Sequence, residues 1–216
     1  MNDTLSLFES LKSWTEKILQ VHTAYDIVKD PVLIDILKTV AHAQPQWFAS
    51  TLVYIKTEKK KDGVIAGLAI LRKYSTKLFK EAFPMVIWTA EDLITFVDIN
   101  RQMGLGLGKS AKTAIAQWIK DNITEDMAIT YRDKLADIIL MIHMPPSDII
   151  FDYIIAAKKH VDNEKLQQVY KKYPKIGAFE AAKYFAEKGK VHDAIQVINA
   201  YSISPNLLHL NLKEVA

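Results

Sequence analysis

The 216-residue sequence predicts an all-α fold, and two observations support this prediction. Glycine and proline are scarce, with seven residues of each, so few positions interrupt a helix. Apolar residues recur at intervals of three and four, which is the spacing of one helix face. Irregular paired helices of this kind are typical of an α-solenoid, in which helical hairpins stack into a superhelical arc.

The first two clear helices follow one another directly. "DPVLIDILKTVAHA" begins with Asp30 as an N-cap and Pro31 in the first turn, both typical of a helix start. "QPQWFASTLVYIKTEKKK" repeats the proline at its opening and ends in three lysines. We therefore expect a helical hairpin over residues 30–61. The charged run 58–62 is then a solvated loop or, alternatively, an RNA contact.

The helical spacing continues through "DGVIAGLAILRKYS" and "STKLFKEAF", residues 62–83. "TAEDLITFVDINRQM" then opens with the capping-box pattern Thr89-x-x-Asp92. Its segment "LITFVDI" would also suit a strand. We favour a helix because Leu93, Phe96 and Val97 share one helix face and the cap is in place.

The remainder of the sequence is also helical in pattern. Pro145 and Pro146 end the helix that starts near Thr124. Four further segments of helix length follow, separated by Pro174, Gly177, Gly189 and Pro205. No linker-like composition divides the chain, so the sequence predicts a single domain over residues 1–216.

Composition excludes several classes of function. The absence of cysteine rules out disulfides, thiolate chemistry and cysteine-bound zinc. The six histidines lack metal-site spacing, and there is no serine nucleophile elbow or outstanding carboxylate pair, so we expect no enzyme activity, metal or cofactor. His143 is interpreted as a structural histidine. No segment approaches 18 apolar residues, and the N-terminus lacks signal-peptide features, so we expect a cytoplasmic protein without membrane contact.

The most unusual stretch is "RQMGLGLGKSAKTAIAQWI", residues 101–119. A Walker A loop needs four residues between its glycines, but only three separate Gly104 from Gly108, and a P-loop follows a strand. The dinucleotide pattern fails too, because Lys109 stands where its third glycine belongs. We therefore expect Gly104 and Gly108 to end one helix and start the next.

The helix that follows these glycines has two distinct faces. An apolar stripe runs through Ala111, Ala114, Ile115, Trp118 and Ile119, with Lys109, Lys112 and Lys120 nearly opposite. The two lysines of the first turn conflict with the helix dipole, a conflict that an anionic partner would relieve. The face is therefore either a solvated basic face or an RNA phosphate contact. The same two interpretations stay open for Lys73, Lys77 and Lys80, which interleave with aromatic residues.

"GKSAKTAIAQW" resembles a signature of the TROVE domain, the module of the Ro autoantigen. The matching positions are Gly108, Lys109, Lys112, Ala114, Ile115, Ala116 and Trp118. A second motif, "KLADIILMIHMPPSD", is similar to the family's downstream motif at Asp137, His143 and the prolines that follow. With the preceding helices, the resemblance covers about residues 30–150.

The resemblance implies a HEAT-like helical arc or ring that binds small structured, non-coding or misfolded RNA in a ribonucleoprotein. The RNA-binding residues that it implies, together with the basic face, are Arg101, Lys109, Lys112, Lys120, Arg132 and Lys134. Leu135 and Leu140 stand where the family has a histidine and an arginine, and no metal motif of the family's von Willebrand factor A domain is present. These departures favour an alternative function, a scaffold subunit that associates with itself or with a partner protein to complete the ring through exposed apolar surface.

Overall fold

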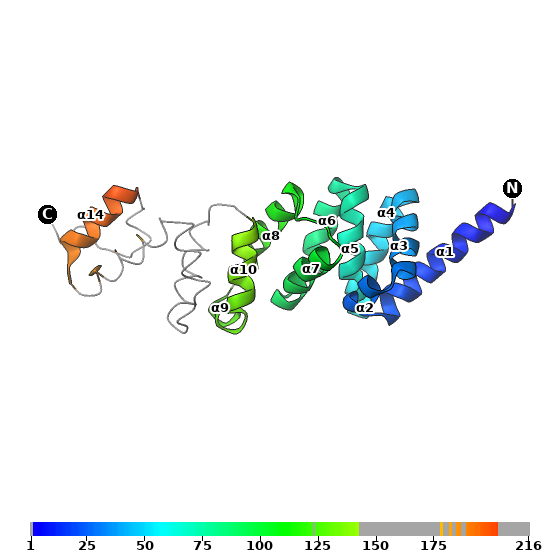
Figure 1. Ribbon diagram of the computed structural model, residues 1–216, viewed down its shortest axis with the longest axis horizontal. Helices are drawn as coiled ribbons and strands as arrows, with labels where there is room; N and C mark the ends of the chain where they lie inside the picture. Colours follow the sequence, from blue (N-terminus) through cyan, green and yellow to red (C-terminus); the bar gives the residue numbers. More distant parts are fainter. Residues whose placement is uncertain are drawn as a thin grey trace. The chain divides into compact units, whose positions relative to one another are not determined.

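The computed structural model describes residues 2–122, 124–142 and 189–202, with single positions at 178, 182, 185 and 186 (Figure 1). By its internal contacts the chain divides into two compact units, Met1–Trp118 and Ile119–Ala216. The helices of the first unit are α1 (Asn2–Val21), α2 (Ala24–Lys29), α3 (Pro31–Ala43), α4 (Pro45–Tyr54), the π-helical turn η1 (Ile55–Lys59), α5 (Gly63–Tyr74), α6 (Thr76–Val86) and α7 (Ala90–Gln102). The next helix, α8 (Lys109–Asn122), crosses the boundary, and α9 (Glu125–Thr130), α10 (Arg132–Ile142) and α14 (Val191–Tyr201) belong to the second unit.

All regular structure in the described ranges is helical, which confirms the all-α prediction. The division between the units falls inside a continuous helix and not in a linker, and the single-domain organisation stays a prediction. The arrangement of the helices as an arc also stays a prediction. His143, Pro145 and Pro146 lie outside the described ranges, as do the three helices expected over 146–190 apart from the few positions given above. Helix α14 confirms the last expected helix.

The predicted helix starts are made by the expected side chains. Asp30 Oδ1 accepts hydrogen bonds from the backbone N–H groups of Val32 and Leu33, and Pro31 occupies the first position of α3. Thr89 and Asp92 form the full capping box of α7, so "LITFVDI" is helical and not a strand. Local hydrogen bonds of this kind depend only on residues close in sequence, which is why the sequence predicts them.

Helix α5 is the central element of the first unit. It packs against α1, α2, α3, α4, α6 and α7 (Figure 1). All its residues from Gly63 to Leu71 are buried. At Gly63 the approach is close, because a Cβ atom there would lie 2.5 Å from the carbonyl oxygen of His22 and 2.6 Å from that of Leu19. Only glycine permits this backbone contact between α5 and the end of α1.

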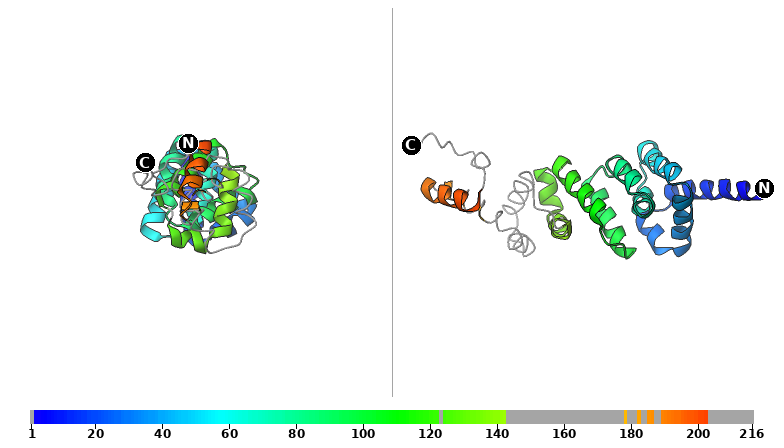
Figure 2. Two further views of the ribbon diagram at one scale, coloured as in Figure 1. Left: turned by 90° about the vertical axis from the view of Figure 1, so that its left-hand side faces the viewer. Right: turned by 90° about the horizontal axis from the view of Figure 1, so that it is seen from above.

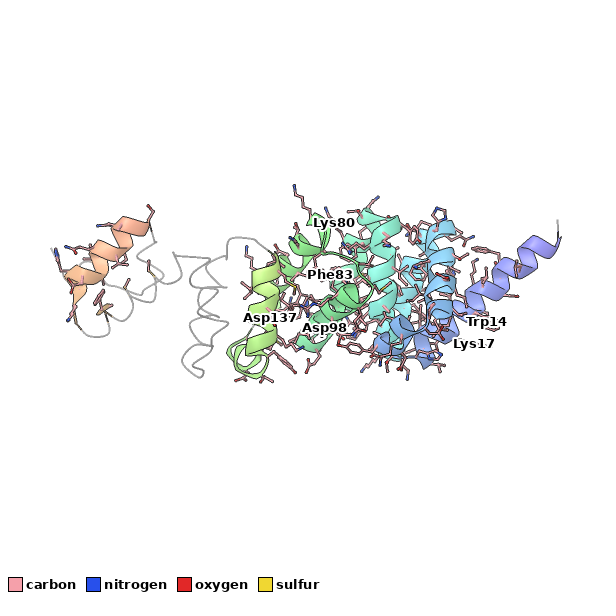
Figure 3. All side chains as sticks on the ribbon, in the orientation of Figure 1. Trp14, Lys17, Lys80, Phe83, Asp98 and Asp137 are labelled. Atoms are coloured by element: carbon pink, nitrogen blue, oxygen red, sulfur yellow. The ribbon has the colours of Figure 1, made fainter. Side chains whose placement is uncertain are left out.

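An aromatic cluster joins α6 and α7 on one side of this core. The ring centroids of Phe79, Phe83 and Phe96 lie 5.3–5.9 Å apart, and all three side chains are buried. Figure 3 shows Phe83 inside the unit and Lys80, one turn earlier on α6, at its surface. The helix-spaced apolar residues of these segments therefore form the core, as their periodicity predicts.

The second unit is described in less of its length. Within it, α9 begins at an N-cap in which Thr124 Oγ1 accepts from the N–H of Met127, and α9 packs against α10. Leu135, Ile138, Ile139 and Ile142 form the buried face of α10, and Ala194 and Ile198 are buried on α14, the orange helix of Figure 2. None of the helices in the described ranges combines the length and the apolar character needed to cross a bilayer.

Candidate nucleic-acid interface

The glycine-rich segment 103–108 connects α7 to α8 and is held by two helix ends. Gly104 adopts a left-handed conformation with φ of 63°. Its N–H donates to the carbonyl of Arg101, and the N–H of Leu105 donates to that of Asn100. This pair of bonds is a Schellman motif and confirms that Gly104 ends a helix. The carbonyl of Gly108 accepts from the N–H of Lys112, so Gly108 starts the next helix, as expected.

Arg72, at the end of α5, fixes the middle of this segment. One guanidinium nitrogen, Nη2, donates to the carbonyl of Gly106 at 2.8 Å and to Oδ1 of Asn100 at 2.9 Å. The amide of Asn100 in turn donates to the carbonyl of Phe96 at 2.7 Å. A Cβ atom at Gly108 would lie 3.2 Å from Arg72 Nη1, so the segment runs close along the guanidinium.

These contacts decide the electrostatics of the glycine segment. At Gly106 it directs a carbonyl oxygen toward a cation, whereas a phosphate-binding loop directs several N–H groups toward an anion. The segment also follows a helix and not a strand. Burial lowers the pKa of Arg72, but an arginine stays protonated throughout the physiological range. The Gly106 carbonyl that faces Arg72 and the helix that precedes the segment both agree with the prediction that this is not a nucleotide loop.

Helix α8 has the two faces that its sequence predicts. Ala111, Ile115 and Trp118 are buried, and Trp118 Nε1 donates to the carbonyl of Ile87 at 2.8 Å, which anchors α8 to the end of α6. Lys109 is exposed and Lys112 is half-buried on the other face. The amphipathic pattern therefore orients these lysines toward solvent.

Further lysines lie on α6, which follows Arg72 in the chain, and on α8, which follows the glycine segment that Arg72 contacts. Lys73 follows Arg72 directly, Ser75 caps α6, and Lys77 and Lys80 lie in its first two turns. We call the following set the basic edge: Lys73, Lys77, Lys80, Lys109 and Lys112. Among the described residues none of these lysines has an ion-pair partner, and all except the half-buried Lys112 are exposed.

The other predicted site residues lie on α7 or in the second unit. Arg101 is exposed on the last turn of α7, with Nη1 3.9 Å from Oδ1 of Asp98. Lys120 and Lys134 are exposed in the second unit. Arg132 begins α10, and its side chain lies outside the described set. The structure therefore brings Lys109 and Lys112 together near Arg72, while the other residues stay separate predictions.

One expectation about the second motif is wrong. Leu135 was expected to supply exposed apolar surface for assembly, but its side chain is 0% exposed. It lies on the same face of α10 as Ile138, Ile139 and Ile142, so its apolar character serves the core. The side chain of Leu140 lies outside the described set.

Two polar contacts escaped prediction from the sequence. Arg72 was not singled out, although a single arginine after nine buried residues of a helix is a usable signal. The sequence pattern also predicts no partner for Lys56. Its ammonium binds both carboxylate oxygens of Asp92 and lies 5.2 Å from the ring centre of Trp88. Nothing within a few residues of Lys56 indicates this partner.

No protein-family model matches the chain, and neither the curated proteins nor the solved structures include a match. The resemblance to the TROVE domain therefore stays a prediction. Within the described ranges, no group of three or more histidine, aspartate or glutamate side chains is arranged to hold a metal ion.

Proposed function

We propose that the chain is a non-catalytic RNA-binding protein that contacts phosphates through the basic edge, as part of a cytoplasmic ribonucleoprotein. The observation that carries this proposal is that the five lysines of the basic edge lack acidic partners among the described residues. Small structured or single-stranded RNA is the expected partner, because a local basic patch on a mildly basic chain binds phosphates without requiring a base sequence.

The geometry around Arg72 supports this proposal. Lys109 and Lys112 lie in the first turn of α8, where the partial positive charge of the helix end disfavours cations. The arginine adds a further fixed positive charge beside them. Positive groups gathered without compensation are stabilised by an anionic ligand, and a polyanion releases counterions when it binds them.

The test replaces Lys109 and Lys112 together with glutamate. The matched control is Lys59→Glu with Lys60→Glu, two exposed lysines at the end of η1. Each pair of replacements lowers the formal net charge by four, from +3 to −1. Binding of a labelled oligoribonucleotide is measured by fluorescence anisotropy at several salt concentrations. We expect the first variant to lose at least about tenfold in affinity and to show a shallower salt dependence.

Two other outcomes would contradict the assignment of Lys109 and Lys112 to the RNA interface. Equal losses in both variants would show either that only net charge matters or that the run 58–62 also contacts RNA, and both results contradict an interface confined to the basic edge. An unchanged affinity in the first variant would remove α8 from the interface. Far-UV circular dichroism checks that both variants keep their helicity, which is expected because the replaced side chains lie outside the core.

The scaffold alternative loses one of its two supporting residues, because Leu135 is buried. The ultraviolet absorbance ratio of the freshly purified protein separates the two functions when light scattering is recorded on the same sample. Co-purifying nucleic acid supports RNA binding. A clean oligomer without nucleic acid supports a scaffold.

A further inference from the structure

Helix α1 carries apolar side chains that no described residue of the first unit covers. Leu7, Trp14 and Val21 are spaced by seven residues and are 63%, 60% and 75% exposed. The adjacent face, with Ile18 and Leu19, is buried against the rest of the unit. Figure 1 shows the N-terminal half of α1 projecting sideways beyond α3 and α4. A tryptophan exposed in this way is unusual on a monomer surface and marks an interaction site.

A groove between α4 and α6 in the same unit offers a complementary surface. Its volume is about 350 Å³. Small residues, Ala49, Ser50 and Ala82, lie along it, and Tyr54 and Met85 line it with side chains that are 57% and 52% exposed. This volume is at the lower end of the roughly 300–1,000 Å³ of ligand pockets, so it suits one large side chain more than a whole helix.

The two surfaces also match in charge. Lys17 is exposed one turn after Trp14 on α1 (Figure 3). Glu81 is the one charged residue among those that line the groove. Neither side chain has an ion-pair partner among the described residues. A helix that places an aromatic side chain in the groove can therefore place a cation beside its carboxylate.

We propose that α1 of one copy of this chain docks into the α4–α6 groove of a second copy, with Trp14 in the groove and Lys17 beside Glu81. Within one chain, α1 packs on α3, α5 and η1. Because the two surfaces differ, the contact is heterologous and extends into a ring or a filament. This inference does not depend on RNA binding.

Sedimentation velocity of the full chain over a range of concentrations tests the contact, after nuclease treatment so that RNA does not bridge copies and at low salt so that the Lys17–Glu81 pair is not screened. Trp14→Gln removes the docking side chain, and Tyr54→Gln with Met85→Gln removes the apolar edge of the groove. Val32→Gln is the control, because Val32 is 65% exposed on α3 and belongs to neither surface. We expect association to weaken at least about tenfold in both test variants and to stay unchanged in the control.

Mixing the two test variants distinguishes this contact from a symmetric one. The Trp14 variant keeps an intact groove, and the groove variant keeps an intact α1. An equimolar mixture is therefore expected to form a 1:1 dimer and nothing larger. If α1 instead paired with α1, the groove variant would associate like the unaltered chain, and the proposal would be wrong.

A charge exchange gives a test that leaves the apolar residues untouched. Lys17→Glu and Glu81→Lys are each expected to weaken association about two- to fivefold, and the double variant to restore it. Failure of the double variant to recover, or an unaltered chain that stays monomeric at every concentration, overturns the proposal. Unchanged circular dichroism confirms that each variant is folded, since all replaced side chains are exposed.

Discussion

Lys56 and Asp92 form a buried ion pair that joins η1 to α7. Lys56 Nζ lies 2.8 Å from Oδ1 and 2.9 Å from Oδ2 of Asp92, and the two side chains are only 8% and 11% exposed. The same carboxylate accepts hydrogen bonds from the N–H groups of Trp88 and Thr89. The pair therefore holds the start of α7 against the turn that ends α4.

Removing the cation from this pair is expected to destabilise the first unit strongly. Lys56→Met leaves a nearly buried carboxylate without its counter-charge, which costs about 3–5 kcal/mol of unfolding free energy. Urea unfolding followed by circular dichroism measures the loss. Lys59→Met is the control, because Lys59 is an exposed lysine of the same turn and its replacement should change stability by less than about 0.5 kcal/mol. Equal effects of the two changes would contradict a role for the buried pair.

The contact between Arg72 and the glycine segment predicts a local effect. Arg72→Lys keeps the charge but loses the guanidinium nitrogen Nη2, which contacts Asn100 and Gly106 together. We expect the N–H groups of Gly104 and Leu105 to exchange with deuterium faster, and stability to fall by about 1.5–3 kcal/mol. Lys73→Arg is the control, since Lys73 is exposed next to it. Unchanged exchange at Gly104 and Leu105 in the Arg72 variant would show that the arginine does not hold the segment.

The close contact at Gly63 predicts that even a methyl group is not tolerated. Gly63→Ala places Cβ against the carbonyl oxygens of Leu19 and His22, which are backbone atoms and cannot rotate away. We expect a loss of about 1–3 kcal/mol, measured by thermal or urea unfolding. Gly106→Ala is a matched control with open space around its Cβ and no left-handed φ, so its stability should be unchanged or slightly higher. If neither Gly63→Ala nor Gly106→Ala changed the stability, α1 and α5 would lie further apart than in this structure.

The capping box of α2 predicts a pH effect. Hydrogen bonds from the Thr23 hydroxyl and then from its backbone N–H lower the pKa of Asp26. Because the folded-state pKa lies below the unfolded value, this contribution to stability is present above the unfolded pKa and is lost as pH falls through the folded one. Thr23→Ala should raise the Asp26 pKa part of the way back, since the N–H remains. Carboxyl carbon shifts measured by NMR against pH report both values, and an identical pKa in the variant would exclude the hydroxyl as the main cause.

Local sequence predicts the candidate site only in part. The apolar stripe of α8 identifies Lys109 and Lys112 as surface residues, because helix periodicity fixes which side chains share a face. The same argument could not show that the end of α5 meets the glycine segment before α8, because this contact joins Arg72 to Gly106, 34 positions along the chain. Nor could it show that Leu135 is buried, since a motif position says nothing about packing.

Local sequence is enough to predict the helices of the first unit and where several of them begin and end. The residues that mark these helix ends bind or shape backbone groups only a few positions away, so a short segment is enough to predict each end. They are Asp30 with Pro31, Thr89 with Asp92, and Gly104. Three contacts became visible only in the folded structure. Lys56 binds Asp92, 36 positions away, Gly63 lies against the backbone at the end of α1, and Arg72 binds the glycine segment. Such contacts depend on how the helices pack, because desolvation and close approach arise only when segments far apart in sequence meet.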